Sequence, residues 1–161
     1  MSERRILGPE DGELYEPERA CGDRFLINSR DWGGRFSLVE HRLPPKVLAA
    51  PVHMHTLEDE FSFILEGTVG ARFGDEEVVA RPGDLVFKPR GEWHTLWNAG
   101  DEPARLLEII SPGGLEELFR KLDGLTQELT PEQADGLVGP YGCSADMEAT
   151  MALVEKHHLV F

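Results

Sequence analysis

The chain has 161 residues, of which 40% are hydrophobic and 29% are charged, and its 17 glycines and 11 prolines are spread along its length. This composition indicates one globular domain with a substantial core and excludes a fibrous or disordered protein. The net charge of −14, with no local Lys/Arg cluster, argues against nucleic acid as a partner, because phosphate backbones are bound by basic surfaces.

The N-terminus, MSERRILGPEDG, lacks the apolar segment of a secretory signal. No run approaches the roughly 20 apolar residues of a membrane-spanning helix. Cys21 and Cys143 lie far apart and outside any CxxC or zinc-ribbon spacing, so we expect ordinary thiols in a reducing cytoplasm, with a disulfide between them as the alternative. We therefore expect a cytoplasmic protein with no membrane partner.

The pattern along the chain divides it into three parts. From about Arg35 to Ile110, short apolar runs alternate with turn signals, as in an antiparallel sandwich or barrel. We predict an N-terminal arm over residues 1–34, an all-β barrel over 35–111 and a helical C-terminal extension over 112–161. This extension should pack on the barrel or on a partner subunit.

Three turns in the barrel region can be predicted from their residues. Gly74-Asp75 separates two strand-like runs, as in a two-residue hairpin with Gly at its first central position. RPGD at 81–84 places Gly83 where a type II turn needs positive φ, and KPRG at 88–91 fits a type I turn. The segments 84–88 and 93–98 are then short strands.

The extension has helical signals. A first helix is predicted to end at Gly124, because four apolar residues precede it at helical spacing: Leu115, Leu118, Phe119 and Leu122. TPEQ at 130–133 is a capping box with Pro at the first helical position. Ser144 is predicted to cap a last helix over about residues 145–158.

The segment PVHMHTLEDE, residues 51–60, holds two histidines one residue apart. On a strand, residues i and i+2 face the same side, so His53 and His55 can point at one place while Met54 faces away. This pattern alone leaves two interpretations open: a pair of metal ligands, or two histidines satisfied by solvent or by backbone carbonyls.

Residues further along the chain resemble the two motifs of the cupin family. The first motif, HxH followed by Glu and Gly, corresponds to His53, His55, Glu60 and Gly67. The second corresponds to Gly83, Pro89, Gly91, His94 and Asn98. The sequence departs from the first motif at Val47, where the family often has glycine.

The resemblance implies a cupin jelly-roll barrel in which His53, His55, Glu60 and His94 converge on one divalent transition metal: Fe, Mn, Ni, Co, Cu or Zn. Imidazole and carboxylate ligands suit these ions, and four protein ligands leave positions open for water, substrate or dioxygen. A metal-free sandwich with degenerate histidines is the alternative.

Strand alternation then predicts what surrounds the metal. Glu60 places Ser62 and Ile64 inside, and His94 places Leu96 inside, so we expect a small, mostly apolar substrate pocket. Trp93 and Trp97 face outward, and so do three apolar residues of the other strand: Phe61, Phe63 and Leu65. These three need cover from the tail helices or from a second subunit in a homodimer. The alternative is that Phe61 and Phe63 fill the barrel and Glu60 is solvated. For His41 we expect an ordinary surface or satisfied role, with the pocket as the alternative.

The reaction follows less directly from these residues, because one fold hosts many activities. The chain resembles small bacterial single-domain cupins of the quercetinase-like kind. The leading expectation is a metal-dependent dioxygenase or related oxidoreductase for a small aromatic or enolic substrate, with Glu60 as a base as well as a ligand. A non-oxidative isomerase, cyclase or decarboxylase is the second hypothesis, and a non-catalytic small-molecule-binding protein is the third.

Overall fold

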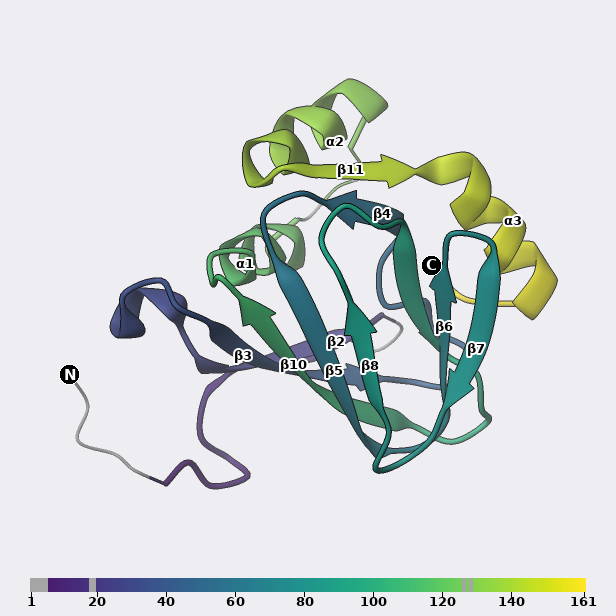
Figure 1. The fold of residues 1–161 in the computed structure, drawn as a ribbon. Helices are drawn as coiled ribbons and strands as arrows, with labels where there is room; N and C mark the ends of the chain where they lie inside the picture. Colours follow the sequence, from purple (N-terminus) through teal and green to yellow (C-terminus); the bar gives the residue numbers. More distant parts are fainter. Residues whose placement is uncertain (1–5, 18–19, 126, 128) are drawn as a thin grey trace.

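The computed structural model describes residues 6–17, 20–125, 127 and 129–161, which build two antiparallel β-sheets around a common interior (Figure 1). The first sheet has the strand order β1 (Glu13–Tyr15), β2 (Gly22–Ile27), β3 (Ser37–Leu43), β10 (Ala104–Ser111), β5 (Asp59–Glu66) and β8 (Leu85–Lys88). The second has the order β11 (Cys143–Asp146), β4 (Val52–His55), β9 (His94–Asn98), β6 (Val69–Phe73) and β7 (Glu76–Ala80). The mostly β, two-sheet architecture confirms the predicted fold class.

The α-helices in the described residues follow β10, the last long strand of the barrel: α1 (Glu116–Asp123), α2 (Pro131–Val138) and α3 (Met147–His157). Figure 1 shows α2 at the top, α3 at the right and α1 at the left. Short 3₁₀ turns lie at Ser29–Trp32 and Gly139–Tyr141. In the part of the chain that the structure describes, no helix is long and apolar enough to cross a membrane.

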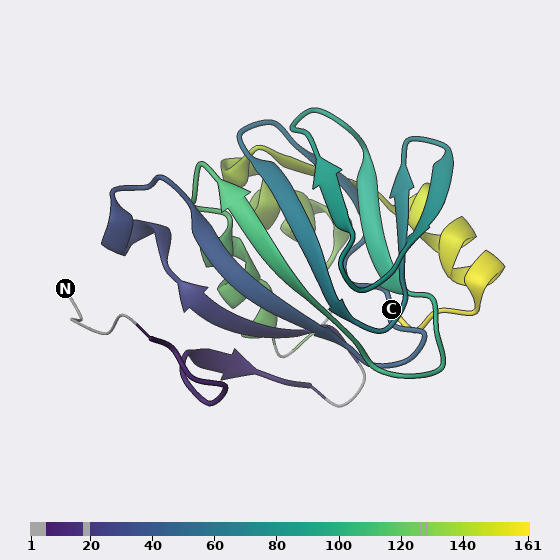
Figure 2. The same ribbon diagram turned by 60° about the horizontal axis from the view of Figure 1, so that its bottom comes forward.

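The segment predicted as an N-terminal arm contributes two strands to the first sheet. β2 pairs with β3, and β1 pairs with β2 at the sheet edge (Figure 2). The boundaries at 34/35 and 111/112 stay a prediction, but residues 13–15 and 22–27 belong to the sheet.

The predicted turns have the backbone that their residues require. Gly74 has φ 54° between β6 and β7, and Gly83 has φ 95° in the turn before β8. The amide of Asp84 donates to the carbonyl of Arg81 at 2.9 Å, which closes that turn. These tight connections set the register of β6, β7 and β8.

The extension agrees with the sequence in its first two helices and differs in the third. α1 ends at Gly124, and the capping box of α2 is formed by Thr130 and Gln133. The last helix begins later than predicted, because residues 143–146 pair with β4 as an extra strand, and Asp146 caps α3 by accepting from the amide of Ala149. The prediction of Ser144 as the cap is therefore wrong: β11 covers the edge of the strand that carries the two histidines.

The main apolar cluster between the sheets is buried, with Leu43, Ile64 and Leu106 among its largest side chains. On the outside of the second sheet, α3 packs Leu153 against the cluster that contains Trp97, which is only 2% exposed. Glu77 on β7 accepts from Lys156 and lies 2.8 Å from His157, so α3 is also held to the sheet by polar contacts.

The residues of β5 face inward and outward as predicted, but in the described residues the tail helices do not cover its outward face. Glu60, Ser62 and Ile64 are buried, whereas Phe63 on the opposite face is 40% exposed. The tail helices were one expected cover for this face. α3 instead covers Trp97, because β11 carries the chain past β4 to the other sheet.

Candidate metal centre

Four side chains from four positions in the barrel meet in its interior: His53 and His55 on β4, Glu60 on β5 and His94 on β9. Their ligand atoms all lie within 4.8 Å of one another. His55 Nε2 is 3.4 Å from Glu60 Oε2, and His94 Nε2 is 3.5 Å from the same oxygen. The register of β4 and β9 pairs His53 directly with His94, which brings the two sequence motifs together.

Backbone carbonyls orient two of the histidines. The Nδ1 of His53 lies 2.8 Å from the carbonyl oxygen of Pro51, and that of His94 lies 2.9 Å from the carbonyl oxygen of Glu92. In a neutral ring, an Nδ1–H that donates to a carbonyl leaves Nε2 as a lone pair. Metal-binding histidines are held in this way, with one nitrogen on a protein acceptor and the other facing the ion.

The electrostatics keep at least one ring neutral. Burial lowers the pKa of His53 to about 3, and repulsion from His94 adds to the effect. A neutral imidazole is the form that can donate its electron pair to a metal. His55 differs: burial lowers its pKa, but Glu60 outweighs burial, and the net shift is upward.

A buried lysine fixes the carboxylate. Lys88 Nζ lies 2.7 Å from Glu60 Oε2 and 2.9 Å from Glu108 Oε2, and all three side chains are at least 95% buried. Burial raises the pKa of Glu60, but Lys88 and the contacts with His55 and His94 bring it well below its usual range. Burial also lowers the pKa of Lys88, and its two carboxylate partners more than reverse this.

Sequence reasoning missed Lys88, although a signal for it was present. In β8 the residues alternate, with Leu85 and Phe87 exposed and Val86 and Lys88 buried. The same parity argument that placed Ser62 inside would have placed Lys88 inside, opposite Glu60 in the register of β5 and β8.

Glu58, which the motif excludes as a ligand, is a buried neighbour of the site. It is 4% exposed, and its Oε2 lies 3.8 Å from His55 Nδ1, on the side of the ring away from Glu60. Burial raises the pKa of Glu58. Glu58 therefore lies where it can orient the His55 ring from its Nδ1 side.

These residues fit a divalent ion. In the described residues, neither ring nitrogen of His55 nor the Nε2 of His94 has a hydrogen-bond partner, although all three atoms are buried. Buried polar atoms are normally paired, and nitrogen and oxygen ligands at about 2.0–2.2 Å from one ion would be about 3–4 Å apart. The barrel therefore contains a candidate metal site formed by His53, His55, Glu60 and His94, which the sequence had predicted as the ligand set.

The site opens into a cavity of about 140 Å³. Its apolar walls are Ala49, Ala50, Leu96, Leu106, Phe119 and Leu122, and its charged or titratable groups beyond the candidate ligands are Cys21, Asp23, His41, Lys88, Glu108 and Asp123. An apolar cavity of this volume holds a ligand about the size of benzene. Most of the accessible wall of the cavity is apolar, as the sequence had predicted, but the titratable groups on it were not predicted.

Of the three predicted pocket residues, only Leu96 lines the cavity. Ser62 points into the barrel but donates to Glu108 Oε2 at 2.7 Å, and Ile64 belongs to the apolar core. The correction has a physical reason: the long side chains of Lys88 and Glu108 fill the interior beside Ser62.

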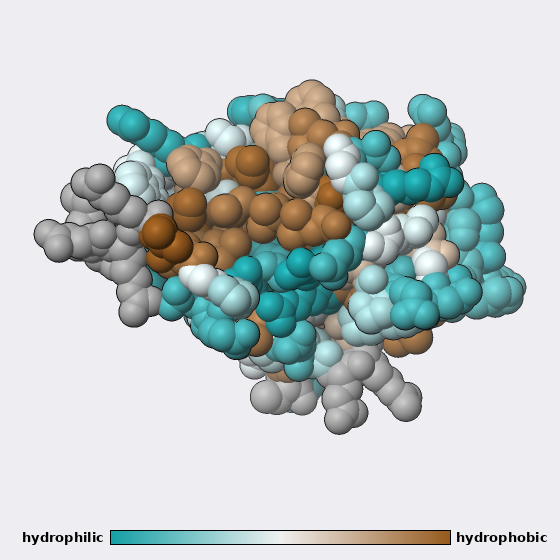
Figure 3. Space-filling view, turned by 90° about the horizontal axis from the view of Figure 1, so that it is seen from below, coloured by the Kyte–Doolittle hydropathy of each residue, from teal (hydrophilic) through white to brown (hydrophobic). Residues whose placement is uncertain are grey.

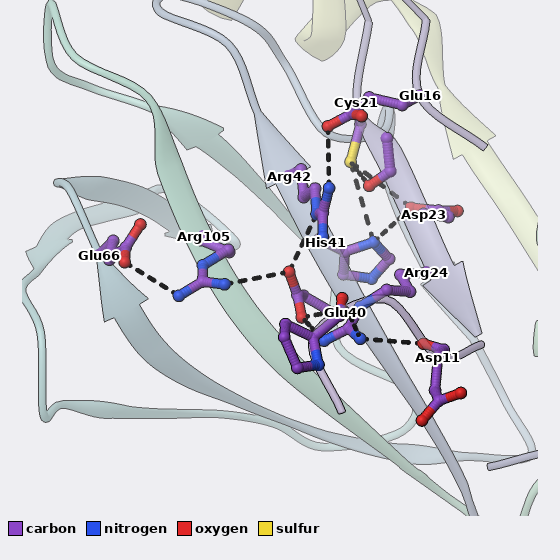
Figure 4. A network of polar contacts seen from close by, with 12 residues as sticks. Asp11, Glu16, Cys21, Asp23, Arg24, Glu40, His41, Arg42, Glu66 and Arg105 are labelled. Atoms are coloured by element: carbon purple, nitrogen blue, oxygen red, sulfur yellow. Dashed lines mark hydrogen bonds and ion pairs between the residues drawn. The ribbon is translucent and has the colours of Figure 1, made fainter. Parts of the chain in front are cut away.

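His41 was expected to have an ordinary surface or satisfied role, and the structure places it on the cavity wall. It lies 2.6 Å from Asp23, and Cys21 is adjacent (Figure 4). Both Cys21 and Cys143 are free thiols, as the sequence predicted.

Comparisons with known proteins agree with the fold. Residues 39–110 match the family model described as a cupin domain. A stretch of 60 residues is 35% identical to the tetracenomycin polyketide synthase protein TcmJ of Streptomyces glaucescens and covers 37% of this chain and 40% of that protein. The match thus spans less than half of that relative's length.

Two solved structures are similar to this chain. The protein TT1209 from Thermus thermophilus is 32% identical, with 61% of this chain and 88% of that chain covered and a TM-score of 0.54. A sugar phosphate isomerase from a cupin superfamily, from Silicibacter pomeroyi, is 28% identical, with 56% and 59% covered and a TM-score of 0.50. The two-sheet barrel and the family match agree: residues 39–110 match the cupin domain, and the chain has a mostly β, two-sheet cupin fold.

Proposed function

We propose that this protein is a metal-dependent enzyme for a small enolic or aromatic carbonyl compound, and that it works without net oxidation, as an isomerase, cyclase or decarboxylase. The observation that carries the proposal is the joint placement of two features in one cavity. Three candidate metal ligands, His53, Glu60 and His94, share its walls with the His41–Asp23 pair. A Lewis acid and a group that moves protons are the two requirements of enolate chemistry.

The chain's own residues have distinct tasks in this proposal. A divalent ion at the site would supply Lewis acidity toward a substrate oxygen. Glu60 is better suited as a ligand than as a base, because Lys88 helps to hold its pKa well below its usual range and a weakly basic carboxylate accepts protons poorly. Leu96 and Leu106 contact the carbon skeleton and exclude water from the cavity.

The names of similar proteins support the non-oxidative class. One relative is a polyketide synthase protein and one solved structure is a sugar phosphate isomerase. Both names belong to areas of chemistry in which carbonyl compounds react through enols. These names describe those proteins, and for this chain they support a proposal about the class of substrate.

The dioxygenase hypothesis keeps one specific observation in its favour. Three imidazoles and one carboxylate leave coordination positions free, as oxygen chemistry requires. In that case the metal would be redox-active, and the substrate would be consumed together with dioxygen. A protein that only binds small molecules would show neither turnover nor oxygen uptake.

Metal content tests the foundation of the proposal. Purified protein should carry about one transition metal ion per chain, measured by inductively coupled plasma mass spectrometry. His53→Ala and His94→Ala should both lose it, whereas His158→Asn, at an exposed histidine of the tail, should keep it. Full metal content in both ligand variants would refute the site.

Oxygen uptake separates the two reaction classes. Protein reconstituted with Fe, Mn, Ni, Co, Cu or Zn is mixed with flavonols and small enediols in an oxygen electrode. The proposal predicts no uptake above that of the metal-free protein, together with conversion of a carbonyl substrate detected by NMR. Stoichiometric oxygen consumption with any of these metals would favour the dioxygenase.

A homodimer remains part of the proposal. Four large apolar side chains on the outer face of the first sheet are 39–59% exposed and lie on adjacent strands: Phe63, Leu85, Phe87 and Ile109. Together they expose on the order of 300 Å², which is comparable with the largest apolar patch of a typical monomer, and such patches are often interaction sites. Seen from below, apolar residues also gather in a band across the molecule (Figure 3). A second copy of this chain would bury the outer face of β5, β8 and β10 in a self-complementary contact.

Light scattering after size exclusion measures the assembly state. The wild type should have the mass of two chains, and Leu85→Ser with Phe87→Ser should have the mass of one. Val79→Ser, at a residue 52% exposed on the second sheet, is the matched control and should remain a dimer. A monomeric wild type would contradict the proposal.

A further inference from the structure

Three polar side chains of the first sheet form a second group on the cavity wall: Cys21, Asp23 and His41. Asp23 and His41 are direct partners in the register of β2 and β3, so their side chains leave the sheet on the same face. His41 shares its strand parity with the buried residues Val39 and Leu43, which is why it points into the barrel. Figure 4 shows Asp23 and Cys21 on the same side of its ring, both joined to it by dashed lines.

The two ring nitrogens of His41 have different surroundings. Nδ1 lies 2.6 Å from Asp23 Oδ1, a short hydrogen bond to a carboxylate that is itself buried. Among the described residues, Nε2 has no hydrogen-bond partner, and the side chain, 13% exposed, lines the cavity. An aspartate that holds Nδ1–H fixes both the tautomer and the direction of the ring. The free nitrogen is therefore the one that can meet a ligand.

The distances argue against two other roles for this group. Nitrogen and oxygen ligands of one tetrahedral ion would be about 3.3 Å apart, as the 3.4 Å and 3.5 Å separations of the main site nearly are. The 2.6 Å between Asp23 and His41 is instead a hydrogen bond. A Cys-His-Asp nucleophilic arrangement would use both ring nitrogens, but Cys21 Sγ also approaches Nδ1, at 3.8 Å.

The charges around His41 favour its protonated form. Burial lowers the pKa of His41, but Asp23 outweighs burial and raises it well above its ordinary value. Asp123 on α1 and Glu108 on β10 also interact with its charge, and the half-buried Cys21, whose pKa is raised, remains a neutral thiol. Lys88 uses two of its three N–H donors on Glu60 and Glu108. A protonated His41 is a second cavity cation, and its Nε2–H has no partner in the part of the chain that the structure describes.

We propose that His41, oriented by Asp23, is a catalytic acid that delivers the proton on its Nε2 to an enol or enolate bound in the cavity. This inference rests on the proposed function and adds a second catalytic group on the β3 wall of the cavity. It narrows the substrate class to small carbonyl compounds whose reaction ends with protonation of carbon or oxygen.

The step is a simple proton transfer. The electron pair of the enolate carbon forms a new C–H bond with the proton, and the pair of the broken N–H bond stays on Nε2. His41 becomes neutral and keeps its Nδ1–H on Asp23. A proton removed from the substrate earlier in an isomerisation, or one taken from water, then restores the cation.

Keto–enol relaxation of acetylacetone provides the test, because it reports proton transfer to carbon without a known natural substrate. Acetylacetone diluted from acetonitrile into buffer contains excess enol, whose ultraviolet absorbance decays as the carbon is protonated. Metal-loaded wild-type protein should accelerate this decay. His41→Gln should lose about 100-fold of the acceleration, within the usual range for a general acid, and Asp23→Asn about tenfold, while His158→Asn keeps all of it.

A second measurement distinguishes proton donation from a merely structural role. The His41 ring should titrate above pH 6.5 by NMR, and the acceleration should fall with increasing pH along the same curve. Asp23→Asn should move both curves together toward lower pH. The metal content of every variant is measured alongside.

Each outcome has a definite meaning. Full acceleration in His41→Gln, or a pH profile that does not follow the His41 titration, would overturn the inference. Wild-type protein that holds its metal but leaves the decay at the buffer rate would overturn it as well. Wild-type protein without any metal would instead contradict the proposed metal centre.

Discussion

Lys88 Nζ lies 2.7 Å from Glu60 Oε2, so the carboxylate among the three histidines is also one end of a buried ion pair. The other end of the network is Glu108, whose Oε2 lies 2.9 Å from the same ammonium group. The lysine arises from the pairing of β5 with β8, where Glu60 and Lys88 are opposite each other. One cation thus supports two buried acids.

Replacing Lys88 by Met should destabilise the fold by about 3–5 kcal/mol, because removal of one partner leaves buried charges uncompensated. Urea denaturation monitored by circular dichroism measures the change. Lys156→Met is the control: its partner Glu77 lies on the surface side of β7, and an exposed pair contributes at most about 1 kcal/mol. Equal losses in both variants would contradict the inferred importance of the buried network.

Chelation of the metal should lower the stability of the protein. A ligand that binds only the folded state at 100 times its dissociation constant stabilises that state by about 2.7 kcal/mol. Wild-type protein should therefore unfold at lower temperature after EDTA treatment, in a calorimetric or fluorescence scan. His94→Ala should not respond to EDTA, since its metal site is already incomplete.

Gly70 should tolerate no side chain. A Cβ at this position would lie 2.1 Å from Cε2 of Trp97, on the neighbouring strand β9. Because Trp97 is itself buried under α3, Gly70→Ala should cost about 1–3 kcal/mol through overpacking. The matched control is Gly136→Ala inside α2, where a Cβ meets nothing within 4 Å and helix propensity predicts a gain of up to about 1 kcal/mol.

The candidate ligand set could be predicted because motif spacing and strand parity are local properties of the sequence. His53 and His55 face the same way on β4, and Glu60 sets the inward face of β5. Their convergence with His94 required only the family pattern. The same parity correctly placed Ser62 and Ile64 inside the barrel.

The composition of the cavity could not be predicted in this way, because it depends on which strands become neighbours. His41 lies beside Asp23 only through the pairing of β2 with β3, and the sequence had assigned β2 to an arm. The position of Lys88 opposite Glu60 depends on the register of β8 against β5. The strand over residues 143–146 could not be predicted for a similar reason. These residues have helical neighbours in sequence, but the free edge of β4 pairs with them.

Asp123 should make the stability of the protein depend on pH near neutrality. Burial raises the pKa of this carboxyl to about 7, and repulsion from Asp23 adds to the shift. In the unfolded chain an aspartate loses its proton near pH 3.9, so the stabilising effect of the bound proton is complete below that pH and is lost as the pH rises to about 7.

The raised pKa of His41 changes the stability in the same direction. Its stabilising contribution is present below pH 6.5 and is lost as the pH rises through the higher folded-state pKa. Below pH 6.5 the lowered pKa of His53 acts in the opposite direction, because the unfolded chain then binds the proton more tightly. The midpoint of urea unfolding should therefore fall between pH 6.5 and pH 8, and Asp123→Asn should reduce this fall. Asp135→Asn, at an exposed position on α2, should leave it unchanged. A midpoint that rises over this interval in the wild type would show that Asp123 is ionised in the folded protein.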